Sequence, residues 1–337
     1  MIIESGPLTN EFKCQNPFVY TMHHVDHFPA GDGKLEPVEK RRGGDDGDID
    51  PKAPWRMYYG ERVPGFPAHP HRGFETVTVV MEGTVDHTDG LGSSGRYEDG
   101  DVQWMTAGKG LQHAEMFPLR KTDGPNRMEL FQIWLSLDGA KRMVEPAYKM
   151  LWKEEIPVIE TKDARGGKTK ITLIAGRFAD KSAPPPTPDS WAADPKNKLG
   201  IMLFELEPNA TCKVPAGTET MKRSLYFYDG DRLEIGDTPL TEPSYAFVSA
   251  DQPVGLKNTG EKTARVLVLE AEPIETPIVV HGPFVMSSAD EIRQAYKDFR
   301  ETAFGGWPFD DEEIYHAPDQ VRYATYADGS TNYPPQR

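Results

Sequence analysis

Short runs of β-branched and aromatic residues, separated by glycine-rich turns, recur along most of this chain. Examples are GFETVTVVM at 73–81 and MELFQIWLSL at 128–137, and later LGIMLFELE at 199–207 and ARVLVLEA at 264–271. Runs of this kind, bounded by turn residues and spaced by about 8–15 residues, are typical of β-sandwiches and β-barrels. The 31 glycines and 30 prolines among the 337 residues favour tight turns over long helices. We therefore predict an all-β protein.

The segment 179–198 divides this series of strands into two halves. It contains five prolines and few apolar residues, a composition that favours an extended linker. We therefore expect a first domain at 1–178, a linker at 179–198, a second domain at 199–306 and an extended tail at 307–337. The glycine-rich and acidic residues 31–53 lack an apolar period and are expected to form a surface insertion.

One helix is expected near the end of the second domain. Ser288 begins a capping box, because Glu291 follows three residues later, and Gly305–Gly306 end the helical pattern. The apolar side chains that recur at helical spacing are Ile292, Ala295, Tyr296 and Phe299. We predict a helix over 288–304 whose apolar face packs against one of the β domains.

The charge and the cysteine count exclude several classes of protein. The formal net charge is 38 − 53 = −15, so direct binding to nucleic-acid phosphates or to an anionic membrane is not expected. No stretch approaches the length of uninterrupted apolar residues that a transmembrane helix needs, and no signal-peptide pattern is visible. Two cysteines, Cys14 and Cys212, cannot supply a disulfide framework. We expect a cytoplasmic protein.

Two pairs of potential metal ligands carry the chemistry of the chain: His69-Pro-His71 and His113-Ala-Glu115. On a β-strand, residues i and i+2 point to the same face, so two such strands facing one interior would place four donors around a point. Three imidazoles and one carboxylate suit a divalent transition metal and leave coordination positions open for a substrate or O₂. The donor types alone do not choose among Fe, Mn, Co, Ni, Cu and Zn.

The motifs around these residues resemble those of a known family. His69-x-His71, followed by Glu75 and Gly83, resembles the first cupin motif, and the stretch from Gly100 to His113 resembles the second. Three longer stretches closely resemble the pirin family: HPHRGFETVT, DVQWMTAGKGLQHAEM and GPFVMSSADEIRQAYKDF. The resemblance covers roughly 55–305 and implies two cupin-type β-barrel domains, a bicupin, with a short C-terminal helix and an extended tail.

The resemblance also implies which residues hold the metal. The N-terminal domain would bind one metal, most often Fe(II), through His69, His71, His113 and Glu115. Glu75 is the alternative fourth ligand, because the general cupin pattern uses that position, whereas pirins use the glutamate that follows the last histidine. Glu75 lies four residues beyond His71 on the same nominal face, about 13 Å further along an extended strand, and we expect it to stay outside the metal site. Residues 182–280 contain no histidine, so the second domain is expected to be metal-free.

Several pirin-like proteins resemble quercetinases, so the first functional hypothesis is a metal-dependent dioxygenase. Glu115 would take the proton of a flavonol hydroxyl at the metal, and O₂ would then open the ring with release of carbon monoxide. The alternative is a metal-containing, redox-sensing regulator that acts through a protein partner, as eukaryotic pirins are regarded. Substrate and O₂ would be the partners of the enzyme. The oligomeric state is left open.

The remaining candidate residues are interpreted as structural. His23, His24 and His27 lack a matching carboxylate pair, and His87 falls in a turn-rich segment, DHTDGLG. The apolar residues next to the ligands could either line a flat aromatic pocket or pack in the core; they are Phe74, Trp104, Met105, Met116 and Phe117.

Overall fold

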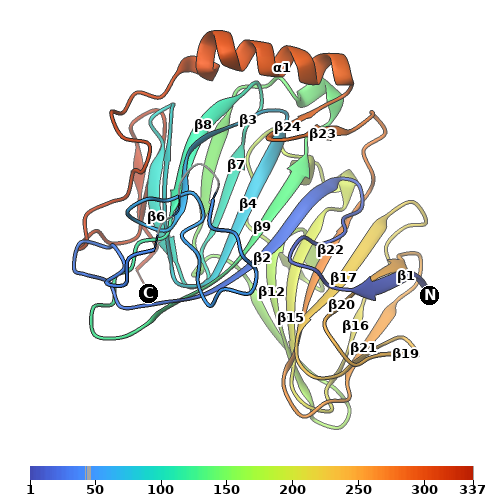
Figure 1. Cartoon of the computed structure of the whole chain (residues 1–337). Helices are drawn as coiled ribbons and strands as arrows, with labels where there is room; N and C mark the ends of the chain where they lie inside the picture. Colours follow the sequence, from blue (N-terminus) through green and yellow to red (C-terminus); the bar gives the residue numbers. More distant parts are fainter. Residues whose placement is uncertain (42, 44–46, 337) are drawn as a thin grey trace. The chain divides into compact units, whose positions relative to one another are not determined.

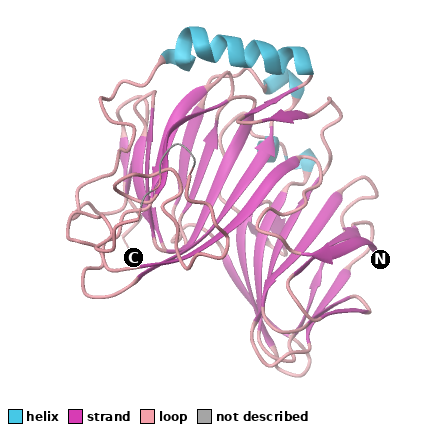
Figure 2. Cartoon of the chain, viewed as in Figure 1, coloured by secondary structure: helices cyan, strands magenta, loops and turns pink. Residues whose placement is uncertain are grey.

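A computed structural model of the chain describes residues 1–41, 43 and 47–336 (Figure 1). The contacts between its residues divide the chain into two compact units. The first unit contains Met22–Glu154 and Thr276–Arg337, and the second contains Met1–Thr21 and Glu155–Glu275. Strands dominate both units (Figure 2), which confirms the prediction of an all-β fold.

The unit Met22–Glu154/Thr276–Arg337 contains two larger antiparallel sheets. One has the order β10 (Ala147–Leu151), β7 (Val102–Thr106), β4 (Phe74–Glu82), β9 (Asn126–Ser136) and β2 (Phe18–Phe28). The other has the order β26 (Thr331–Asn332), β25 (Tyr323–Thr325), β6 (Ser94–Glu98), β5 (Thr84–Asp89), β8 (Leu111–Met116) and β3 (Gly65–His71). Side chains from both sheets meet in one interior, since the ring of His71 on β3 contacts that of Trp134 on β9.

Alternation along β4 separates the two faces of its sheet. Thr78 donates a hydrogen bond to Glu115 on β8 in the opposite sheet, so the even-numbered residues of β4 face the shared interior. The odd-numbered Glu75 and Val77 lie on the other face. A turn at Gly73, whose φ is +86°, separates β3 from β4. A side chain there would meet the carbonyl of Val285 at 1.8 Å, which explains the glycine.

Helix α1 (Ala289–Thr302) confirms the predicted cap and apolar stripe. Ser288 accepts a hydrogen bond from the backbone N–H of Glu291. Ile292 and Ala295 are buried, and Tyr296 and Phe299 pack against the same cluster, which also contains Phe284 and Met286. The cluster joins α1 to the hairpin of β23 (Val279–His281) and β24 (Phe284–Met286). In Figure 1, α1 lies across the ends of β3 and β8, and the short helix η4 (Ala303–Gly305) contacts β8.

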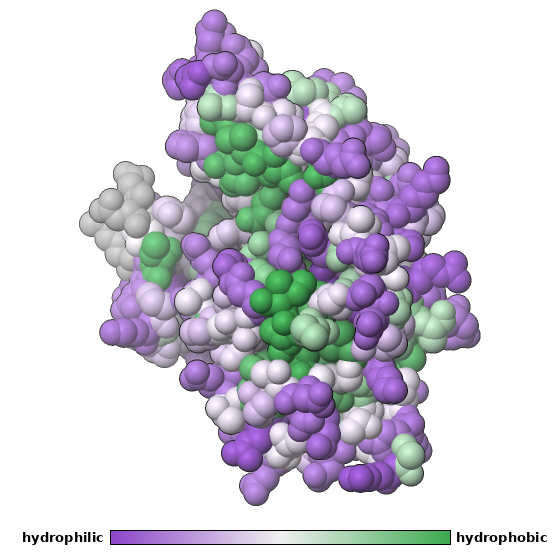
Figure 3. Space-filling model, turned by 90° about the vertical axis from the view of Figure 1, so that its right-hand side faces the viewer, coloured by the Kyte–Doolittle hydropathy of each residue, from purple (hydrophilic) through white to green (hydrophobic). Residues whose placement is uncertain are grey.

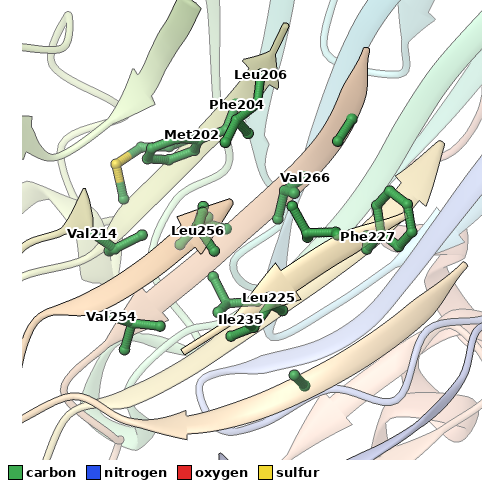
Figure 4. Close-up of a cluster of buried hydrophobic side chains, with 14 of the residues drawn as sticks. Met202, Phe204, Leu206, Val214, Leu225, Phe227, Ile235, Val254, Leu256 and Val266 are labelled. Atoms are coloured by element: carbon green, nitrogen blue, oxygen red, sulfur yellow. The ribbon is translucent and has the colours of Figure 1, made fainter. Parts of the chain in front are cut away.

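The unit Met1–Thr21/Glu155–Glu275 is built from a seven-stranded and a four-stranded sheet. The first has the order β1 (Ile2–Pro7), β20 (Ser244–Ser249), β17 (Lys222–Asp229), β22 (Ala264–Ala271), β15 (Gly200–Leu206), β12 (Lys168–Ala175) and β11 (Val158–Lys162). The second has the order β16 (Thr211–Val214), β21 (Val254–Asn258), β18 (Leu233–Ile235) and β19 (Thr238–Leu240). Apolar side chains from both sheets, such as Phe204, Leu225 and Leu256, form its core (Figure 4). Burying each such side chain contributes roughly 1.5–3 kcal/mol.

Short elements complete the two units. They are η1 (Gly139–Lys141), β13 (Arg177–Phe178), β14 (Lys181–Ser182), η2 (Trp191–Ala193) and η3 (Pro195–Asn197).

The division of the chain differs from the domain boundaries expected from the sequence. Strands β11 and β12, expected in the first domain at 1–178, pair with each other, and β12 also pairs with β15 of the second unit. The N-terminal strand β1 joins the same sheet by pairing with β20. The proline-rich segment 179–198 lies within that unit and carries η2 and η3. Helix α1, expected in the second domain at 199–306, belongs to the first unit, because its apolar face packs on β24.

The two regions of unusual composition are also placed. The described residues of the insertion at 31–53 form isolated bridges only, although Leu35 is buried against Val63 and Met116. Arg42 and residues 44–46 of the same insertion lie outside the described part. The tail at 307–337 contributes β25, which pairs with β6. Hydrophilic residues cover most of the face shown in Figure 3 and surround separate hydrophobic areas. None of the helices in the described part of the chain has the length and hydrophobicity needed to cross a membrane.

Candidate metal centre

Three histidines from β3 and β8 meet in the interior of the first unit. The antiparallel register sets His69 directly opposite His113, and His71 shares the face of His69 because it lies two residues further along β3. One ring nitrogen from each of the three side chains lies within 4.8 Å of the others. The ring centroids are 4.4–5.0 Å apart. The structure therefore brings together the three imidazoles predicted from the sequence.

The hydrogen bonds of these imidazoles leave nitrogen atoms free to bind a cation. His69 uses Nδ1 to bond the carbonyl of Pro67 at 2.8 Å, which leaves the lone pair of Nε2 available. Nδ1 of His71 and Nε2 of His113 are buried and have no hydrogen-bond partner among the described residues. Buried polar atoms are rarely left without a partner in folded proteins. The arrangement therefore fits a metal ion that three imidazoles could hold.

Burial also keeps the three imidazoles neutral, the form in which they bind metals. It lowers the pKa of His69 from its ordinary value to about 4. For His71 and His113, burial and the neighbouring imidazoles hold the pKa well below the usual range. All three rings are therefore unprotonated at neutral pH.

Glu115 lies at the edge of this group. Its Oε2 is 3.9 Å from Nε2 of His113 and accepts a hydrogen bond from Gln132 at 2.8 Å. Its Oε1 accepts hydrogen bonds from Thr78 at 2.9 Å and from Tyr97 at 3.4 Å. Burial raises the pKa of the carboxyl group, although these hydrogen bonds oppose the shift. The structure thus places a buried carboxylate beside the three imidazoles.

Glu75 lies on the opposite face of its sheet, and the reason differs from the one expected. The sequence places Glu75 on the face of His71, but the turn at Gly73 starts a new strand, and that strand belongs to the other sheet. The carboxylate of Glu75 is fully buried and accepts hydrogen bonds from Trp104 at 2.9 Å and Thr106 at 2.8 Å. Glu75 is therefore separated from the imidazoles because its side chain points to the other face of a different sheet, and not because of the distance along a single extended strand.

An open cleft of about 740 Å³ reaches His69 from the surface. Tyr59, Phe66 and Pro67 contribute apolar surface to its wall, and the tail contributes the acidic residues 310–313. The tail is held in place by Glu313, whose carboxylate accepts hydrogen bonds from the backbone N–H groups of Glu61 and Arg62. Of the two alternatives for the apolar residues next to the ligands, lining a pocket or packing in the core, the structure shows core packing, because none of them lines this cleft. Phe74, Trp104, Met105, Met116 and Phe117 are at most 3% exposed and pack in the core.

Sequence reasoning missed one histidine of this interior. His87 falls in a segment with the composition of a turn, but it lies on β5 and is fully buried. Its ring contacts that of His113. The signal in the sequence was a third i, i+2 pair, His87-Thr-Asp89. Of the other histidines, His23 bonds Glu129 and the buried His24 bonds Tyr58, as the structural interpretation predicted.

Comparisons with known proteins agree with this fold. The family model "Pirin" matches residues 47–135, and the model "Pirin C-terminal cupin domain" matches residues 201–305. A Pseudomonas aeruginosa protein with the name "Putative quercetin 2,3-dioxygenase" is 36% identical over 248 residues, which are 71% of this chain and 80% of that protein. Human pirin is 34% identical over 265 residues, which are 77% of this chain and 84% of that protein.

Among solved structures, a quercetin 2,3-dioxygenase from Acinetobacter baumannii has a similar fold. Its TM-score is 0.69 at 25% sequence identity, with coverage of 90% of this chain and 98% of that chain. The two family models together match more than half of the residues. This chain therefore belongs to the pirin family, the two-cupin proteins that its histidine motifs resemble.

Proposed function

We propose that this protein is a metal-dependent dioxygenase of the quercetinase type, which opens a flavonol ring with O₂. The observation that carries the proposal is the group of three neutral imidazoles, of which His71 and His113 are buried and have ring nitrogens without a hydrogen-bond partner among the described residues. The names of the Pseudomonas and Acinetobacter proteins support the class of substrate. In this proposal His69, His71, His113 and Glu115 hold one divalent metal. Imidazole and carboxylate donors suit Fe(II), the metal we propose, as well as Mn, Co, Ni, Cu and Zn.

The chemistry of the reaction divides between the metal and the chain. A divalent metal bound here would act as a Lewis acid that lowers the pKa of a flavonol hydroxyl. Glu115 accepts the proton of that hydroxyl. Because burial raises the pKa of Glu115, its ionised form is a stronger base than an exposed carboxylate. The hydrogen bonds from Thr78 and Gln132 hold the carboxylate toward the imidazoles. The products of flavonol and O₂ are then a ring-opened ester and carbon monoxide.

The cleft beside His69 is the proposed entrance for the flavonol. Its volume of about 740 Å³ falls within the roughly 300–1,000 Å³ of typical small-molecule sites. Tyr59 and Phe66 offer aromatic surface to a flat ring system, with ring centroids 6.0 Å apart. The acidic residues 310–313 that line the cleft would disfavour anionic compounds and admit neutral phenols.

Elemental analysis of freshly purified protein, combined with an oxygen-electrode assay on flavonols, tests this proposal. We expect one divalent metal per chain and stoichiometric consumption of flavonol and O₂ with release of carbon monoxide. A chelator should abolish turnover, and re-added Fe(II) should restore it. Metal-loaded protein that consumes no flavonol would contradict the enzyme and favour the regulator, for which redox-dependent binding of a protein partner without turnover is the signature.

Two matched glutamate variants test the assignment of the fourth ligand. Glu115→Gln removes the base and should lower turnover by roughly 10²–10⁴-fold, with a smaller loss of metal. Glu75→Gln changes an equally buried carboxylate on the opposite face of the sheet and should leave the metal content unchanged. If Glu75→Gln empties the site while Glu115→Gln keeps both metal and activity, the roles of the two residues are reversed.

A further inference from the structure

His87 is a neighbour of the candidate ligand His113. It lies on β5, which pairs with one edge of β8, whereas β3, the strand of His69 and His71, pairs with the other edge. The register of β5 and β8 pairs His87 with Glu115 and Asp89 with His113. Residues that are paired across strands point to the same face, so His87 and Asp89 share the interior with the candidate metal ligands. His87 is fully buried, and its ring stacks on Tyr148 with centroids 4.8 Å apart and planes 9° apart. The ring is therefore held in one orientation.

The contacts of His87 form a line from His113 to a carboxylate. Nδ1 of His87 lies 3.4 Å from Nδ1 of His113. At the other end of the ring, Nε2 of His87 is buried, has no hydrogen-bond partner among the described residues and faces Oδ2 of Asp89 at 3.7 Å. Oδ1 of Asp89 accepts hydrogen bonds from the backbone N–H groups of Leu91 and Ser93, each at 2.9 Å. These bonds fix the carboxylate and leave Oδ2 to face His87.

Only one hydrogen can lie between the two Nδ1 atoms, and two separate considerations favour its placement on His113. Nε2 of His113 is the ring nitrogen without a partner among the described residues; if that atom binds a metal, the ring carries its hydrogen on Nδ1. Separately, the carboxylate of Asp89 favours a hydrogen on Nε2 of His87, which leaves Nδ1 of His87 as an acceptor. Both considerations give the same tautomers, with the hydrogen of His113 on Nδ1, donated to His87, and the hydrogen of His87 on Nε2, toward the charge of the Asp89 carboxylate.

We propose that His87 is a positioning residue for the metal centre: it accepts the Nδ1–H of His113, and Asp89 fixes the tautomer of His87 that can do so. The inference rests on the proposed metal centre but not on the identity of the substrate. Metal-bound histidines commonly donate their second N–H to a carboxylate or carbonyl, which orients the ring and increases its basicity. Here a second imidazole stands between the ligand and the carboxylate.

The first test measures Co(II) affinity of the full chain by competition with a chromophoric chelator, together with the visible Co(II) spectrum. His87→Leu removes the acceptor and should weaken Co(II) binding by roughly 10–100-fold. His87→Asn places a carbonyl oxygen where Nδ1 lies and should restore the affinity to within about threefold of wild type. His24→Leu is the matched control, since His24 is a buried, hydrogen-bonded histidine of the same unit, and it should leave Co(II) affinity and spectrum unchanged.

The second test needs no variant and therefore does not depend on the folding of His87→Leu. Long-range ¹H–¹⁵N spectra of the Zn(II)-loaded wild type report the tautomer of each histidine. We expect His87 to carry its hydrogen on Nε2 and His113 on Nδ1. A hydrogen on Nδ1 of His87 would overturn the proposal, as would wild-type Co(II) affinity in a folded His87→Leu variant. If the wild type binds neither Co(II) nor Zn(II), the metal centre itself is wrong and this role of His87 falls with it. Binding without flavonol turnover would refute only the proposed reaction.

Discussion

Arg72 connects β3, the strand that carries His69 and His71, to helix α1. Its removal should lower the free energy of unfolding. Arg72 directly follows His71 at the end of β3. Its guanidinium donates to the carboxylate of Asp298 on α1 at 2.6 Å and to the carbonyl of Lys109 at 2.6 Å, and it lies 4.2 Å from the centroid of the Phe304 ring. The side chain of Arg72 is 8% exposed, so these contacts are largely shielded from solvent. The hydrogen bond from Arg72 lowers the pKa of Asp298.

The magnitude follows from these three contacts. The hydrogen bond to Lys109 and the contact with the Phe304 ring each contribute about 1 kcal/mol. The ion pair contributes about 1 kcal/mol, because the Asp298 side chain is 30% exposed and solvent screens the attraction. Arg72→Met keeps a long side chain but removes all three contacts, so we expect a loss of roughly 2–3 kcal/mol in the free energy of unfolding. Asp298→Asn should cost about 1 kcal/mol or less.

A double-mutant cycle measured by urea unfolding checks this reasoning. The two single variants and the double variant should show a coupling energy of about 1 kcal/mol between Arg72 and Asp298, which should decrease in high salt. Additivity within about 0.3 kcal/mol would refute the ion pair as a stabilising contact. An Arg72→Met variant that unfolds at the wild-type urea concentration would refute the wider claim that Arg72 fastens α1 to β3.

Three further outcomes are expected. Tyr296→Asp should lower the free energy of unfolding by roughly 2–3 kcal/mol in urea titrations, because the half-buried ring packs on Phe284 and would be replaced by a charge. An unchanged urea midpoint would mean that α1 does not pack on β24. Burial lowers the pKa of His24 to about 3, so the neutral ring stabilises the fold above the unfolded-state pKa of 6.5, and this contribution is lost as the pH falls. Between pH 7 and pH 5 the free energy of unfolding should therefore decrease by roughly 2 kcal/mol more in wild type than in His24→Gln. Equal decreases in the two proteins would contradict a buried neutral ring. Zn(II) at about 100 times its Kd should add about 2.7 kcal/mol to the stability of the wild type, whereas the thermal shift should vanish in His71→Ala; an equal shift in both would place the ion elsewhere.

The repeated i, i+2 spacing made three of the site residues predictable from the sequence. Strand alternation is a local property, so His69 and His71 had to share a face wherever β3 was placed. The position of His113 opposite His69 depends on the pairing of β3 with β8, whereas the motif resemblance implied only that the two motifs share one site. The position of Glu75 was harder, because the turn at Gly73 changes both strand and sheet within two residues of His71. Counting residues along one extended strand could not reveal that change.

The domain boundaries and His87 were missed for a common physical reason: both depend on pairing between distant strands. The proline-rich segment 179–198 is a break in local composition, but hydrogen bonds from β12 to β15 cross it and place both strands in one sheet. In the same way, DHTDGLG has the composition of a turn, yet its first residues continue β5 because β6 and β8 pair on either side. Strand β5 has hydrogen-bonded neighbours on both edges, and a polar side chain such as that of His87 is accommodated in the interior where a neighbouring strand of the same sheet offers polar partners. Here β8 offers His113 and Glu115. The strand that supplies two of the candidate metal ligands therefore also supplies the polar neighbours of the buried His87.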